Sequence, residues 1–273
     1  MSQMRPPRVG ELVAAQLRED ILSGRLKEGD ELGNQEQLFS EYQVSPPALR
    51  EALHILESDG LITVRRGSAG GAVVHAPTPQ RAAQQIAMVL QNRETAPSDV
   101  SVALGYMEPI CAQLCALRED RQEAVVPELR EITGNQHAHI ADTDEYLRHS
   151  SDFHAAIVKL CGNESLIVVI GALEAIWSAH DSQVWKTVAD GIDVEADPAA
   201  PLAIDTRRAA LRAHEKLVTE IEAGRADRAY KIAAGHLSAA HTNTLRSGDD
   251  RQILASLLTG ARVGPRTVAA RRG

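Results

Sequence analysis

The sequence predicts a mainly α-helical protein: an N-terminal winged helix-turn-helix domain with a two-stranded wing, followed by an all-α antiparallel helical bundle. Three observations lead to this expectation. Aromatic residues make up only 3% of the 273-residue chain, which favours a helical core of Leu, Ile, Val and Ala. Two short helical segments near the N-terminus are joined by a tight turn, as in a helix-turn-helix. From about residue 99 to residue 246 the hydrophobic pattern is helical almost without a break.

The second helix of the helix-turn-helix is the most clearly marked element. We expect it at residues 45–60, where Ser45 is a good N-cap and Pro46 and Pro47 follow at the first helical positions. Gly60 is a C-terminal stop. One apolar stripe runs down this helix: Leu49, Ala52, Leu53 and Leu56. A shorter helix is expected at 34–42, just before it. The helix at 45–60 is therefore the second helix of the pair, which would enter a DNA major groove by its N-terminal turn.

The other elements of the first domain come before and after this pair. A helix is expected from residue 10 to 23, preceded by Arg8, and residues 26–32 have the composition of a turn. The apolar face of this helix is expected to consist of Leu12, Val13, Leu17, Ile21 and Leu22. Strand-like runs at 61–66 and 72–75 flank a glycine-rich turn at 67–71 and form the wing, whose tip carries Arg65, Arg66 and Gly67.

Several short motifs in residues 10–75 occur together: Ile21 to Gly29, Val44-Ser45, Arg50-Glu51-Ala52-Leu53, and Gly60-Leu61. With these motifs the segment resembles the DNA-binding domain of the GntR family of bacterial transcription regulators. The resemblance implies operator DNA as a partner. We expect the DNA contacts to come from the residue before the first helix, the N-terminal part of the helix at 45–60 and the wing: Arg8, Ser45, Pro46, Pro47, Arg50, Arg65, Arg66 and Gly67.

Two positions depart from the family pattern. Family members usually carry arginines that contact the operator where this chain has Glu36 and Pro46. Arg50 and the wing are therefore expected to make the major contacts, and the operator differs from the usual one or is bound more weakly. Residues 1–76 hold 8 Lys and Arg against 11 Asp and Glu, so an alternative use of this domain in protein contacts stays open.

A linker and connecting helix are expected at 77–98, the bundle at 99–246 and a flexible basic tail at 247–273. The bundle pattern gives helices at 99–118, 120–140, 142–161, 164–189, 205–223 and 225–246, with an exposed acidic loop at 190–201. The tail contains a short amphipathic helix at 251–258, and its basic end is either solvated or an accessory contact.

Three histidines lie beside apolar residues on three different predicted helices: His154, His214 and His236. A single inward histidine is usually a satisfied core residue, but three from separate helices favour a shared site. Imidazole ligands suit Zn²⁺ or Ni²⁺. The sequence therefore predicts a divalent metal site between the helices.

Residues 99–246 resemble the FCD ligand-binding domain of the FadR subgroup of GntR regulators. The resemblance is carried by Met107-Glu108-Pro109, Asp152-Phe153-His154, Cys161-Gly162-Asn163, the run from Ala223 to Asp227, and His236-Leu237. It implies a metal held by one Asp and three His below a small-molecule pocket. The three histidines match, but Ser150 stands where the family has its Asp, and Asp152 points to roughly the opposite side of the helix.

The expected effector pocket includes Leu104, Glu108 and Trp177. Leu104 replaces an arginine that pairs with an effector carboxylate in many family members, so a larger or acyl-type effector becomes a fair hypothesis beside a carboxylate. Glu108 has two interpretations of equal weight: an effector contact, or a surface charge or internal hydrogen bond. Trp177 either lines the pocket or packs in the core.

The function expected from these features is a ligand-responsive transcription regulator, a homodimer that leaves its operator when an effector binds. A metal-responsive regulator of the same architecture is the first alternative, and a metal-dependent hydrolase is a distant one, because no catalytic motif accompanies the histidines. Cys111, Cys115 and Cys161 include no CxxC pair and indicate reduced thiols in a cytoplasmic protein. No apolar run approaches about 18 residues, so neither export nor a membrane span is expected.

Overall fold

The computed structural model describes residues 7–33, 35–65, 71–191, 203–247 and 252–259. The chain divides into two compact units, residues 1–78 and 79–273, and each is treated by itself. Several predicted features lie outside the described residues: Arg66, Gly67, the acidic loop from residue 192 on, and the tail at 248–251 and 260–273.

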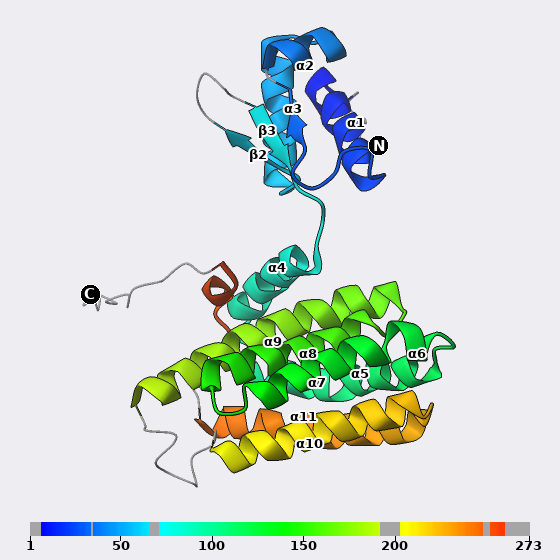
Figure 1. The fold of residues 1–273 in the computed structure, drawn as a ribbon. Coiled ribbons are helices and arrows are strands. Elements are labelled where there is room, and N and C mark those ends of the chain that lie inside the picture. Colours follow the sequence, from blue (N-terminus) through cyan, green and yellow to red (C-terminus); the bar gives the residue numbers. More distant parts are fainter. Residues whose placement is uncertain (1–6, 34, 66–70, 192–202, 248–251, 260–273) are drawn as a thin grey trace, which may run out of the picture. The chain divides into compact units, whose positions relative to one another are not determined.

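The first unit has the predicted winged helix-turn-helix fold (Figure 1). Its elements, in chain order, are α1 (Val9–Leu22), β1 (Glu31–Leu32), α2 (Gln35–Tyr42), α3 (Pro46–Ser58), β2 (Ile62–Arg65) and β3 (Gly71–Val74). The sheet has three strands in the order β1-β3-β2 rather than two, because residues predicted as a turn pair with β3 through Glu31 opposite Val73 and Leu32 opposite Ala72.

Helix α3 is held by the apolar stripe that the sequence marked. Leu49, Ala52, Leu53 and Leu56 are buried against α1 and the sheet. Gly60 has a φ of 72° and ends the helix, as predicted.

Helix α1 buries Val13, Leu17 and Ile21 of the expected apolar face, but not its other two residues. Leu12 and Leu22 are 54% and 58% exposed, and Ala14 is buried instead. A Cβ on Gly10 would lie 2.8 Å from the carbonyl oxygen of Ala48, so a glycine allows the start of α1 to approach the start of α3 this closely.

The second unit is a bundle of antiparallel helices whose neighbours lie side by side in Figure 1. Its elements are α4 (Pro79–Asn92), α5 (Pro97–Leu117), α6 (Arg121–Ala124), α7 (Val126–Ala138), α8 (Thr143–Lys159), α9 (Glu164–Gly191), α10 (Ile204–Glu222), α11 (Ala226–Ser247) and the 3₁₀ helix η1 (Ala255–Thr259). The helix predicted at 120–140 is two helices, because Pro127 has no N–H to donate to the preceding turn.

Helix α5 is the central helix of the bundle and packs against α8, α9, α10 and α11. Among the described residues it is the one helix that is long and apolar enough to cross a membrane, which the sequence expectation had missed. Many of its residues are buried in the protein core, among them Leu104, Cys111, Ala112 and Cys115. This burial accounts for its apolar composition.

Part of the predicted flexible tail is folded onto the bundle. Ile253 is buried, and its N–H donates to the carbonyl oxygen of Thr95 at 3.0 Å. The side chain of Gln91 accepts a hydrogen bond from the N–H of Ala255 at 2.9 Å. Residues 252–254 have no regular secondary structure and 255–259 form a 3₁₀ helix, where an amphipathic helix over 251–258 was expected.

Candidate functional site

The three histidines predicted as metal ligands come together inside the bundle. His154 lies on α8, His214 on α10 and His236 on α11, and one ligand atom from each lies within 4.8 Å of the others. Nε2 of His214 is 2.8 Å from Nε2 of His236. The ring of His154 stacks on that of His236 with centroids 5.3 Å apart. Three different helices therefore present imidazole nitrogens to one point.

Two buried side chains orient the rings from behind. Nδ1 of His154 lies 2.6 Å from Oε1 of Glu108, a residue only 2% exposed. Nδ1 of His214 lies 2.9 Å from Oε1 of Gln136. When these Nδ1 atoms carry the protons and donate them, each ring is left with a free Nε2 lone pair. Glu108 therefore makes the internal hydrogen bond that was one of its two predicted roles.

The cluster is electrostatically uneven. Burial, followed by the charge of His154, lowers the pKa of His236 to about 3. Burial, followed by the charges of His236 and His154, lowers the pKa of His214 well below its ordinary value. For His154, burial acts to lower the pKa, but the charge and hydrogen bond of Glu108 outweigh it and raise the pKa to about 9. Two of the rings are thus held neutral, which is the form that binds a metal.

The donor set fits a divalent metal. It offers three imidazoles, one of them backed by a carboxylate through its second nitrogen, an arrangement that raises the basicity of a metal-ligating histidine. His154, His214 and His236 would hold the ion, and Ser150, on α8 one turn before His154, offers a hydroxyl but no carboxylate. A metal bound here would supply a positive charge and open coordination positions beside the cavity described next.

An internal cavity of about 110 Å³ adjoins the cluster, between α8, α9, α10 and α11. His154, His236, Ser150 and Trp177 line it, so Trp177 lies where the sequence predicted. Leu104 does not line it and is fully buried in the core, which corrects the expectation that it belongs to the pocket. Glu108 does not line it either, because its carboxylate is turned to His154.

The cavity also contains groups that the sequence reasoning missed. Glu174 and Asp181 on α9 face it, and so does His241, which was expected to be a surface or packing residue. Burial raises the pKa of Glu174 to about 8, and also raises that of Asp181. A signal was present in the sequence: five cavity residues of α9 follow helical spacing along one face, namely Glu174, Trp177, Ser178, Asp181 and Trp185.

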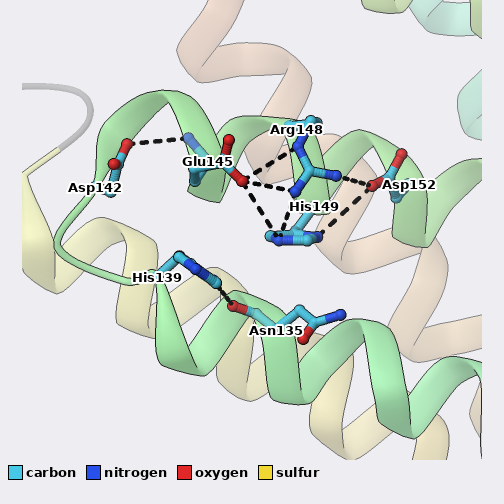
Figure 2. Close-up of polar contacts among 7 residues, drawn as sticks. All are labelled: Asn135, His139, Asp142, Glu145, Arg148, His149 and Asp152. Atoms are coloured by element: carbon cyan, nitrogen blue, oxygen red, sulfur yellow. Dashed lines mark hydrogen bonds and ion pairs between the residues drawn. The ribbon is translucent and has the colours of Figure 1, made fainter.

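Asp152, two residues before His154, is not part of the site. Figure 2 shows it on the outer face of α8, where it pairs with Arg148 at 3.1 Å. Arg148 also pairs with Glu145 at 2.6 Å, and the ring of His149 lies between the two carboxylates. This ladder of charges agrees with the expectation that Asp152 points away from the histidines and cannot replace the missing aspartate.

In the first unit, the N-terminal turn of α3 is exposed. Ser45 caps it by accepting a hydrogen bond from the N–H of Ala48 at 3.5 Å, and Pro46 and Pro47 are exposed beside it. Arg50 is exposed and has no ion pair with any residue that the structure describes. The other two described arginines of the predicted interface do have acidic partners.

Those pairs are Arg8 with Glu51 at 3.2 Å and Arg65 with Glu31 at 2.6 Å. All four side chains are at least one third exposed, so the pairs are weak and a phosphate can replace the carboxylate. Of the described arginines in the predicted interface, Arg50 can therefore contact DNA without first breaking an ion pair.

Comparison with known proteins gives two family matches. Residues 10–71 match the family described as bacterial regulatory proteins, gntR family. Residues 99–239, just over half of the chain, match the FCD domain. The two matches cover the winged helix and most of the bundle.

Named relatives agree with these matches. The Uxu operon regulator of Haemophilus influenzae is 24% identical over 232 residues, which are 84% of this chain and 78% of that protein. The Exu regulon transcriptional regulator of Escherichia coli K12 is 27% identical over 200 residues, 71% of each chain. The HTH-type transcriptional repressor NanR of Klebsiella aerogenes is 23% identical over 160 residues, 57% of this chain and only 60% of the length of that protein.

A solved structure shares the fold. The Streptococcus agalactiae GntR structure superposes with a TM-score of 0.63 at 19% identity, over 85% of this chain and 99% of that one.

Proposed function

The chain belongs to the gntR family of bacterial regulatory proteins, with an FCD domain behind its DNA-binding domain, and on that premise we propose that it is a repressor that leaves its operator when a small effector fills the bundle cavity. It is a ligand-responsive, DNA-binding transcription regulator and not an enzyme. The observation that carries the proposal is the lined cavity beside the three histidines, in a chain whose other unit has an exposed recognition helix. A relative named as a repressor supports the direction of the response.

We propose that α3 enters the major groove of the operator with Arg50 as its main base contact. An arginine to a guanine edge contributes about 1–3 kcal/mol of discrimination. Ser45, Pro46 and Pro47 at the N-terminal turn would lie nearest the bases or phosphates, and Arg8 and Arg65 would meet the backbone. Since a single short helix reads few bases, two copies are needed on a pseudo-palindromic site.

We therefore propose a homodimer. Helix α5 supports it with a row of exposed apolar side chains, Val102, Tyr106 and Ile110, spaced four residues apart on one face. Sedimentation equilibrium of the wild type and of Tyr106→Glu tests this use of the face. Dimers in the wild type and a shift toward monomer in the variant are expected, whereas a variant as dimeric as the wild type would remove α5 from the interface.

We propose that the three histidines hold Zn²⁺ or Ni²⁺ as a fixed part of the effector site. Their geometry and the carboxylate behind His154 support this. A second candidate function, a sensor whose effector is the metal itself, uses the same cluster. Operator binding measured with metal-loaded protein and after chelation separates the two: unchanged affinity after chelation excludes the sensor.

Coupling to the DNA-binding unit would run through α4, the first helix after the linker. Pro79 and Gln80 at its start line a second cavity, and Glu174 lines both that cavity and the effector cavity. A molecule bound at Glu174 can therefore displace the start of α4, to which the DNA-binding unit is joined. Such a regulator acts in the bacterial cytoplasm, which is where we propose that the chain works.

The test of the proposal is operator release. A DNA fragment upstream of the chain's own gene is bound by the wild type, and candidate metabolites are added in a gel-shift or anisotropy assay. The expected result is DNA binding that a small molecule reverses and that the cavity variant Trp177→Ala makes insensitive to that molecule. If the small molecule releases the DNA from every cavity variant as it does from the wild type, the cavity is not the effector site.

A further inference from the structure

One residue that lines the effector cavity, Glu174, has a buried carboxylate oxygen without a hydrogen-bond partner among the described residues. Glu174 is only 6% exposed, and its Oε1 accepts a hydrogen bond from the hydroxyl of Ser178 at 3.3 Å. Its Oε2 is buried and has no hydrogen-bond partner among the described residues. A buried carboxylate oxygen without a donor is costly, so it indicates a group that arrives from outside the chain.

No cationic side chain of the described cavity wall hydrogen-bonds this oxygen, and the imidazole of His154 is engaged by Glu108. The described lining includes no lysine, and its one arginine, Arg207, is bound elsewhere. Nη1 of Arg207 donates to the carbonyl oxygens of Ile140 and Ala141 at 3.0 and 3.1 Å, and Nη2 donates to the hydroxyl of Thr143 at 2.5 Å. Those three residues join α7 to α8 and do not line the cavity, so Arg207 holds that connection together.

A second carboxylate strengthens the negative character of the same wall. Asp181 lies two helical turns after Glu174, and its Oδ1 accepts hydrogen bonds from Nε1 of Trp185 at 2.9 Å and from the hydroxyl of Thr244 at 2.6 Å. An effector carboxylate placed here would add a third negative charge at close range. A protonated amine placed here would instead favour the ionised form of Glu174, whose pKa burial raises, and would complete the hydrogen bonding of its carboxylate beside Asp181.

Three aromatic side chains also form part of the wall. Trp177, Trp185 and Tyr146 all line the cavity, and ring faces attract a desolvated ammonium or guanidinium group. The volume of about 110 Å³ is small against the roughly 300–1,000 Å³ of common ligand pockets, which favours a compact molecule over a long acyl chain.

We propose that the effector is a compact molecule bearing a protonated amine, and that Glu174, assisted by Asp181, is the residue that selects for this amine. The inference rests on the proposed function, since it names the chemistry of the molecule that fills the effector cavity. It places Glu174 in contact with the effector. The histidine cluster can then bind any oxygen or nitrogen acceptor atom that the molecule also carries.

The chain offers a direct assay, because it contains two tryptophans and both line this cavity. Three probes with the same four-carbon skeleton are titrated against tryptophan fluorescence: butane-1,4-diamine, 4-aminobutanoate and succinate. They differ in the number of amines and carboxylates and little in size. The wild type is expected to bind the amine-bearing probes at millimolar concentration or below, and to bind succinate at least tenfold more weakly.

Glu174→Gln keeps the shape of the side chain and removes its charge, and is expected to weaken binding of the amine probes by about tenfold or more. Glu164→Gln is the matched control, the same substitution on an exposed residue of the same helix, and is expected to change nothing. Thermal melting without probe verifies that each variant is folded. Should Glu174→Gln fail to fold, Asp181→Asn takes its place.

The proposal is overturned if succinate is the tightest probe, if no amine binds, or if Glu174→Gln binds the amines as the wild type does. The experiments can refute the amine site without refuting the proposed function, and the proposed function without refuting the amine site. Amines that bind at Glu174 and never release operator DNA would refute the effector-released repressor and keep the amine site. If a carboxylate compound releases operator DNA from the wild type and from Glu174→Gln alike, the effector-released repressor is kept and the amine site is refuted.

Discussion

Removing the charge of Glu108 should weaken metal binding without unfolding the bundle. Glu108 is 2% exposed, and its Oε1 lies 2.6 Å from Nδ1 of His154, whose other nitrogen faces the cluster. Glu108→Gln keeps the volume and an acceptor oxygen but loses the negative charge that polarises the imidazole. Loss of such a partner typically lowers metal affinity by about 10–100-fold, which is about 1.4–2.7 kcal/mol.

The assay is a competition titration of Zn²⁺ between metal-free protein and a chromophoric chelator. Asp152→Asn is the control, because Asp152 lies on α8 two residues from His154 but pairs with Arg148 on the outer face. Its zinc affinity should equal that of the wild type. The smaller affinity of Glu108→Gln should also appear as a smaller rise in melting temperature on addition of zinc, since a bound metal stabilises the fold in proportion to RT ln(1 + [L]/Kd).

Two results would refute this reasoning. Equal zinc affinity in Glu108→Gln and the wild type would mean that the carboxylate does not act on His154. If Asp152→Asn lost as much zinc affinity as Glu108→Gln, the loss would come from removing any nearby negative charge. It would not come from the 2.6 Å contact between Glu108 and His154.

Three further outcomes are expected. Arg50→Ala should weaken operator binding by about 1–3 kcal/mol in an anisotropy titration at physiological salt, and unchanged binding would exclude the docking of α3. Leu56→Ala should lower the unfolding free energy of the first unit by about 2–5 kcal/mol in urea, since Leu56 is fully buried there; a loss under 1 kcal/mol would contradict that burial. Burial raises the pKa of Cys115 to about 12 and raises that of Cys111, so a thiol reagent at pH 8 should label the native chain slowly and the urea-unfolded chain fast. Fast labelling of the native chain would place these thiols at the surface.

The helix-turn-helix could be predicted because its signals are local. A serine cap, two prolines at the first helical positions, an apolar stripe and a terminal glycine all lie within residues 45–60, and each acts through neighbouring residues. The third strand could not be predicted this way. Glu31 and Leu32 form it by pairing with residues about 40 positions later, a contact to which their own local sequence gives no clue.

The histidine cluster was within reach of the sequence, since three inward histidines and a family resemblance pointed to it. The cavity beside it was not. Leu104 was assigned to the cavity from the place of an arginine in related proteins, yet the packing of α5 between four helices turns it into the core. Glu174 and Asp181 were passed over. Their helical spacing with Trp177 and Trp185 marks one face of α9, but it does not say that this face meets α8 and α11 around a cavity.

The sequence by itself therefore determined the order of the helices, the recognition helix with its exposed Arg50, and the three imidazoles available for a metal. Only the tertiary structure decided what surrounds those imidazoles: Glu108 behind His154, and a cavity lined by Glu174, which has a buried oxygen without a described partner. Caps and periodic stripes act over one or two helical turns. The character of a cavity is set by side chains from four helices, and their rotation about their own axes is fixed only when all of them pack together.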